Sequence, residues 1–145
     1  MKQKKSKGLI TSELFRISRL SMEASELVLP VIRDKNLKYQ VEQQQEAYRA
    51  TAARAAEILR KSGIKPAEQS LFLGRVMRGS IKADTSWNKS TPHIAQIAIH
   101  CTDAAMQDLT RTMNRSADDG TESRKLAEEF LKTGQRDVDL LKQYL

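Results

Sequence analysis

Two histidines are the first residues to test for metal chemistry, because imidazole is a common metal ligand. In ferritin-like di-iron proteins, two helices each supply a Glu and the other two each supply a Glu-x-x-His motif, so that carboxylates and imidazoles converge in the core. The residues three positions before His93 and His100 are Ser90 and Ile97. The Glu-x-x-His motif is therefore absent, and the sequence excludes the standard di-iron site.

A non-standard metal site is an alternative interpretation. His100 and Asp103 lie three positions apart in one expected helix, and Glu23 and Glu26 lie three positions apart in another. Positions three apart share a helix face, so these four side chains would converge if the two faces met. The competing interpretation, which we favour, is that all four are solvated or ion-paired, because apolar neighbours of His100 take the core-facing positions. No cofactor is expected unless this site binds a metal ion.

The single cysteine, Cys101, falls within the apolar stripe of an expected helix. A buried cysteine in such a stripe behaves as a small hydrophobic side chain. His100 precedes it directly, but adjacent helical residues do not face each other, so we predict no catalytic Cys–His pair. One cysteine excludes an intramolecular disulfide and suits a reducing cytoplasm. The sequence therefore offers no catalytic residue that we would assign.

A basic helix face is the clearest positive feature. The net charge of +7 is concentrated in the N-terminal lysines and in residues 49–89, which carry nine basic and three acidic groups. Within this range, Arg75, Arg78 and Lys82 are spaced three and four apart and share one face of an expected helix. Such a face could bind an anion, including the phosphates of nucleic acid. The competing interpretation is a solvated charged face, which we favour because aromatic residues for base stacking are few.

Long amphipathic helices must position these residues. Apolar side chains recur at three- and four-residue steps, which predicts four long helices over the ranges 10–29, 37–61, 92–116 and 122–145. Four such helices with short connections pack as an antiparallel bundle by default.

Caps and prolines mark the helix boundaries. Ser90, followed by Pro92 in the first turn, predicts the start of the third long helix, and Thr121 is expected to cap the fourth. Pro66 predicts a short additional helix that ends near residue 82. The polar residues after it, up to residue 91, are expected to form a loop that contains Trp87.

Three glutamines lie near the apolar stripe of the second long helix, at positions 43, 44 and 45. A buried glutamine needs hydrogen-bond partners. Burial of any of the three would therefore indicate a polar pocket in the core of the bundle.

The length and composition predict one globular domain. The chain has 145 residues, of which 39% are hydrophobic and 30% charged, which suits a single folded domain. We expect a disordered basic tail over 1–8 and a helical-bundle domain over 9–145. No apolar run reaches the 18 residues that a membrane span requires, and no signal peptide is recognised. These features favour a cytoplasmic protein.

Beyond these local patterns, the chain resembles an uncharacterised set of bacterial ferritin-like four-helix proteins. The matching residues are Gly63-Ile64-Lys65-Pro66, Gly74-Arg75-Val76-Met77 with Ile81-Lys82, Ser90-Thr91-Pro92-His93-Ile94-Ala95-Gln96, Asp108-Leu109-Thr110, Gln135-Arg136-Asp137-Val138 and Leu141-Lys142-Gln143-Tyr144-Leu145. The resemblance covers nearly all of the chain after residue 10. It implies a ferritin-like bundle and no particular activity, because fold does not carry function.

The predicted fold is therefore all-α, a ferritin-like antiparallel four-helix bundle with one additional short helix in the connection between the second and third long helices. We expect a non-catalytic binding or structural role, with self-association into a homo-oligomer and no membrane span. One alternative is a metal-binding ferritin-like protein that uses the non-standard site. Another alternative is the binding of an anion or of nucleic acid through the basic face.

Overall fold

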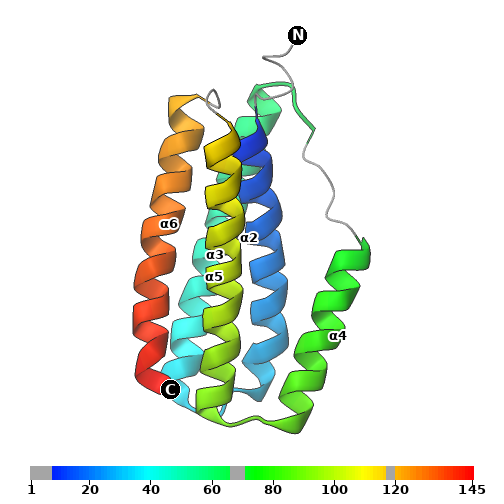
Figure 1. Ribbon diagram of the computed structural model, residues 1–145, viewed down its shortest axis with the longest axis vertical. Helices are drawn as coiled ribbons and strands as arrows, with labels where there is room; N and C mark the ends of the chain where they lie inside the picture. The colour runs from blue at the N-terminus through cyan, green and yellow to red at the C-terminus, as the bar shows by residue number, and fades with distance from the viewer. Residues whose placement is uncertain (1–7, 66–70, 117–119) are drawn as a thin grey trace.

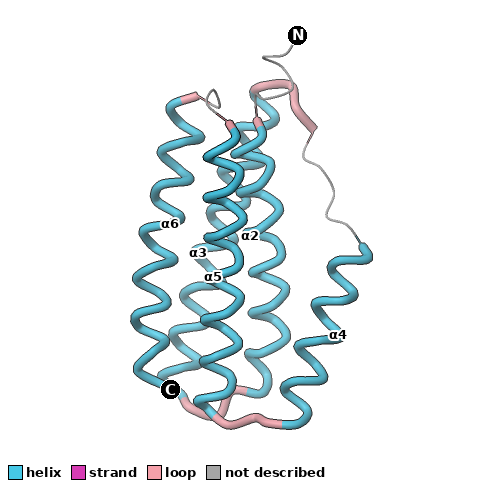
Figure 2. Tube along the Cα trace, viewed as in Figure 1, coloured by secondary structure: helices cyan, strands magenta, loops and turns pink. Residues whose placement is uncertain are grey.

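The protein is all-helical in the computed structural model, which describes residues 8–65, 71–116 and 120–145, with backbone alone for 71–76. No strand occurs among these residues, which confirms the all-α prediction (Figure 2). The elements are α2 (Leu9–Val28), the 3-10 turn η1 (Leu29–Val31), α3 (Lys35–Lys61), α4 (Leu71–Trp87), α5 (Thr91–Arg115), α6 (Thr121–Leu141) and the 3-10 turn η2 (Lys142–Tyr144).

Helices α2, α3, α5 and α6 lie side by side along the long axis of the molecule, and α4 lies outside them (Figure 1). Helix α2 packs against α3 and α5, α6 packs against α5 and α3, and α4 packs against α2. Helices α2 and α6 run in one direction, whereas α3 and α5 run in the other (Figure 1). The connection that contains α4 returns the chain to the end of the bundle at which α3 began, so the additional helix lies where the sequence predicts it.

Polar caps fix the starts of two helices. The Asp34 side chain accepts a hydrogen bond from the Leu37 amide at 2.9 Å at the start of α3. The Ser90 hydroxyl accepts one from the His93 amide at 3.4 Å at the start of α5. These bonds satisfy amide groups that the first helical turn leaves without a partner. The predicted role of Ser90 is confirmed.

The expected cap of α6 is wrong by one residue. Gly120 occupies the cap position, with φ of 82°, and no side chain caps the helix there. Because this positive φ belongs to a conformation that glycine adopts without strain, the chain turns at Gly120 and Thr121 becomes the first helical residue.

Helix α4 extends further than its sequence suggests. The residues after 82 were expected to form a loop, but the helix continues to Trp87. The Thr85 hydroxyl donates to the Ile81 carbonyl at 2.9 Å, and the Ser86 hydroxyl donates to the Lys82 carbonyl at 2.7 Å. Hydroxyls that donate to a carbonyl in the preceding turn are compatible with a helix. The polar residues after 82 therefore do not end α4. The predicted start at residue 66 lies outside the described residues.

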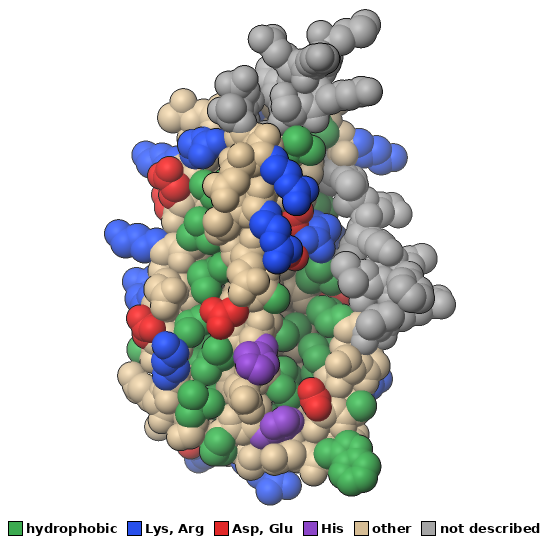
Figure 3. Space-filling model, viewed as in Figure 1, with side chains coloured by type: hydrophobic (Ala, Val, Ile, Leu, Met, Phe, Trp, Pro, Cys, Tyr) green, Lys and Arg blue, Asp and Glu red, His purple; other side chains and the backbone are tan. Residues whose placement is uncertain are grey.

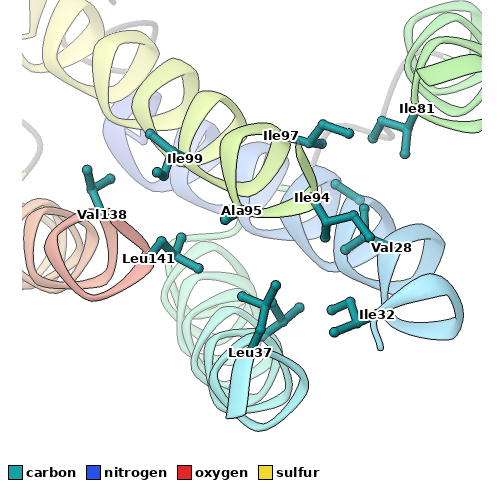
Figure 4. Close-up of a cluster of buried hydrophobic side chains, with 12 residues drawn as sticks. Val28, Ile32, Leu37, Ile81, Ile94, Ala95, Ile97, Ile99, Val138 and Leu141 are labelled. Carbon is teal, nitrogen blue, oxygen red and sulfur yellow. The ribbon is translucent and has the colours of Figure 1, made fainter. Parts of the chain in front are cut away.

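The buried apolar side chains form two clusters, one toward each end of the bundle. One includes Ile10, Leu14, Leu109, Leu126 and Phe130, near the start of α2 and α6. The other gathers side chains from the ends of α2 and α6 and the starts of α3 and α5, among them Val28, Leu37, Ile94 and Leu141. In Figure 4, Ile81 of α4 points toward Ile97 of α5, which places the outer helix against this second cluster.

The start of α2 is closely packed. Gly8, assigned above to the basic tail, is buried at the N-cap of α2 with φ of 92°. A Cβ at this position would lie 2.6 Å from the Ile64 side chain, so only glycine fits without a shift of that side chain. None of the helices in the described part of the chain combines the length and the apolar character that crossing a bilayer requires.

Candidate functional site

Several polar side chains gather in the middle of the bundle, among apolar ones. Gln44 of α3 is only 5% exposed, and it lines a cavity of about 20 Å³ between α2, α3 and α5. The other polar side chains that line this internal cavity are Ser21, Ser25, Tyr48, Cys101 and Thr102. One of the three glutamines is therefore buried and lines a cavity, and apolar side chains of α2, α3 and α5 line the rest of it.

The hydroxyls of Ser25, Tyr48 and Thr102 at the internal cavity are hydrogen-bonded, whereas the amide nitrogen of Gln44 is not. The Thr102 hydroxyl donates to the Ala98 carbonyl at 2.9 Å. Its proton is thereby used, so the Tyr48 hydroxyl is the donor in their mutual contact at 3.3 Å. Nε2 of Gln44 finds no hydrogen-bond partner among the described residues. A buried amide without a hydrogen-bond partner lowers the stability of the fold. A cavity of this size has room for one water molecule.

The titratable groups around the internal cavity are held neutral. Burial raises the pKa of Tyr48 to about 12, against the smaller lowering by its hydrogen bond to Thr102. Burial also raises the pKa of the Cys101 thiol above its ordinary value. A thiolate is the nucleophilic form of cysteine, so Cys101 is poorly suited to nucleophilic catalysis. Its neighbour His100 is exposed.

A second cavity, of about 120 Å³, lies between α3 and α6. We call it the α3–α6 cavity. It shares Tyr48 with the internal cavity, and the Tyr48 and Phe130 rings, whose centroids are 6.0 Å apart, form part of its lining. Arg54 and Glu129, both about half exposed, also line it and form an ion pair at 3.4 Å. The cavity therefore has aromatic walls and a charged pair at its exposed edge.

Asp137 supplies a buried carboxyl group to the α3–α6 cavity. The residue is 7% exposed and lies on α6. Burial raises the pKa of Asp137 to about 6, and the charge of Arg136 lowers it by less. The structure shows no ion pair or hydrogen bond to this carboxyl group from any residue that it describes. The carboxyl group is thus desolvated and lacks a close cation.

The residues proposed for a metal site are not brought together. His100 and Glu26 are exposed, and Asp103 is half-buried. Glu23 forms an ion pair with Arg78 at 3.3 Å. Histidine side chains are visible on the face of the molecule that Figure 3 shows. Within the described ranges, no three His, Cys, Asp or Glu side chains gather closely enough to hold a metal ion.

The basic helix face is only partly available to an anion. Arg78 is already paired with Glu23, and this contact fastens α4 to α2. Lys82 is exposed. The side chain of Arg75 lies outside the described residues. Of the basic side chains expected on this face, the structure therefore describes Arg78 and Lys82, and Glu23 already neutralises Arg78.

Neither Asp137 nor Tyr48 was predicted as a site residue, although the sequence carries a signal for each. Asp137 follows Phe130 by seven positions, so it falls on the same stripe as the apolar residues of α6. Tyr48 follows Gln44 by four positions and shares its helix face. An acid on an apolar stripe and an aromatic hydroxyl beside a buried amide are both uncommon, and together they mark the polar middle of the bundle.

Comparisons with known proteins add no relative. No family model, no curated protein and no solved structure matches this chain.

Proposed function

We propose that the chain is a ferritin-like bundle in its topology. The direction of the helices supports this proposal, because α3 and α5 run parallel and are joined through the long connection that contains α4. A four-helix bundle with one long crossover connection has this order. The resemblance of the sequence to bacterial ferritin-like proteins points to the same arrangement.

The function that we propose is a non-catalytic binding or structural role. The observation that carries it is the composition of the polar middle, where Gln44, Tyr48 and Thr102 line the internal cavity. In di-iron bundles this part of the core holds carboxylates and imidazoles, whereas an amide and two neutral hydroxyls are weak ligands for such metals. The cavity between them has the size of one water molecule, so this part of the core has no room for a substrate.

The metal content of the protein tests this proposal. We would purify untagged protein without chelators and measure bound metals by mass spectrometry, before and after anaerobic reconstitution with iron, manganese or zinc. We expect far less than one metal ion per chain. A stoichiometric metal would overturn the proposal and favour the metal-binding alternative. In that case His100→Ala should remove the metal, with His93→Ala as the matched control on the same helix.

A further inference from the structure

The α3–α6 cavity combines an unfilled volume with a buried acidic side chain, and no described residue forms an ion pair with that acid. Its volume of about 120 Å³ approaches that of an engineered protein cavity of about 150 Å³ that binds benzene. A ligand of about four or five non-hydrogen atoms would therefore fit. Asp137 is the buried acid among its lining residues, and Glu129 is the exposed one, already paired with Arg54.

The Asp137 carboxylate favours a cation as the occupant. A buried carboxylate without an ion pair is costly, and a cation beside it would offset that cost. Arg136 is exposed, and the pKa of Asp137 stays raised despite its charge. The paired guanidinium of Arg54 neutralises Glu129 instead. The site therefore presents one negative charge that the protein leaves without a close partner.

The walls of the cavity favour an organic cation over a metal ion. A metal ion needs several converging ligands, and among the described residues no three His, Cys, Asp or Glu side chains gather closely enough to hold one. Aromatic rings, in contrast, attract ammonium groups. Tyr48 and Phe130 place two rings beside Asp137 in the lining of this cavity.

We propose that the α3–α6 cavity binds a small organic ammonium cation, held by the Asp137 carboxylate beside the rings of Tyr48 and Phe130. This proposal rests on the proposed binding role, because it names the class of ligand that the protein would bind. The two proposals fail separately, because metal analysis decides the first and an ammonium titration decides the second.

The test is an NMR titration of the isotope-labelled protein with ethylammonium chloride at about pH 7.5, with sodium chloride at equal ionic strength as the reference. We expect saturable shifts of the Asp137 carboxyl carbon and of amides that line the cavity, with a dissociation constant on the order of millimolar. Protonation of a group with a pKa of about 6 should weaken binding about tenfold at about pH 5.

Two variants on the same helix separate the site from general surface charge. Asp137→Asn keeps the shape and removes the charge, so it should abolish the saturable shifts. Asp139→Asn removes an exposed carboxylate two residues away and should leave binding unchanged. Shifts that sodium chloride reproduces, or that persist in Asp137→Asn, would overturn the proposal. If Asp137→Asn does not fold, the comparison of ethylammonium with sodium in the wild-type protein still decides it.

Discussion

Asp137 stands on the apolar stripe of α6, and its burial links the stability of the fold to pH. Burial raises the pKa of Asp137 to about 6, from an ordinary value of 3.8. The folded protein therefore binds this proton more tightly than the unfolded chain does. The free energy of unfolding should fall as pH rises through the window between these two values, and Asp137 should add no further slope above it.

We expect Asp137 to lower the free energy of unfolding by about 1 kcal/mol between about pH 5 and about pH 7.5. Urea unfolding at the two pH values, with wild-type protein and Asp137→Asn, measures this change. The substitution should remove this part of the pH dependence. The control is Asp139→Asn, which alters an exposed carboxylate and should preserve the wild-type slope. Equal slopes in the wild type and in Asp137→Asn would contradict the prediction.

Packing between helices sets the tolerance of each helix to substitution, and two glycines illustrate it. Gly134 is buried in α6, and a Cβ there would lie 2.7 Å from Sδ of Met106 on α5. Gly79 lies in α4, and apart from its own helix backbone no atom of the described residues comes within 4 Å of its Cβ position. The first glycine permits a close approach of two helices, whereas the second only weakens its own helix.

We therefore expect opposite effects on the free energy of unfolding. Gly134→Val should lower it by about 1–3 kcal/mol through overpacking. Gly79→Ala should raise it by about 0.5–1 kcal/mol, because alanine is the better helix former. Denaturant unfolding of both variants measures the two effects. A stabilised Gly134→Val variant would show that Met106 yields easily and that the contact between α5 and α6 is looser than described.

The helix caps allow a second comparison between elements. Asp34→Ala should cost about 1 kcal/mol, because its carboxylate accepts from the Leu37 amide at the start of α3. Thr121→Ala should change stability by less than about 0.5 kcal/mol, because Thr121 is exposed and Gly120 holds the cap position. Thermal unfolding of both variants provides the measurement. A larger loss of stability in Thr121→Ala than in Asp34→Ala would show that Thr121 caps α6.

For the molecule as a whole, self-association stays a prediction, and Trp87 offers a way to test it. Trp87 is the single tryptophan, is 92% exposed and ends α4. The exposed side chains of Tyr39 and Leu145 belong to the same end of the bundle, where α3 begins and the chain ends (Figure 1). Tryptophan and tyrosine are enriched in protein interfaces, so this end is the surface that we expect a second copy to cover.

Burial of Trp87 between copies should shift its fluorescence emission to shorter wavelength as protein concentration rises through the micromolar range. Light scattering over the same range should show a mass above that of the 16.4 kDa chain. Trp87→Ala should weaken the association, whereas Tyr144→Ala, which alters a half-buried residue of the core, serves as the control for a general loss of stability. A monomer mass with constant emission would contradict the prediction.

Local patterns in the sequence were sufficient for the helices and for several of their ends. Three- and four-residue periodicity follows from the geometry of the helix itself, and the hydrogen bond at Ser90 involves residues only three positions apart. The same reasoning identified Gln44 as a candidate for burial. These features depend on neighbours in the chain, which is why they could be predicted without knowledge of the fold.

Contacts between helices could not be predicted in this way, because the sequence does not specify how each helix is rotated about its axis or which helix becomes its neighbour. The rotation of α2 and α5 keeps His100 and Asp103 apart from Glu23 and Glu26. The packing of α6 against α3 places Asp137 in one cavity with Tyr48, although 89 positions separate them in the chain. Similarly, the ion pair of Arg78 with Glu23 exists because α4 docks on α2.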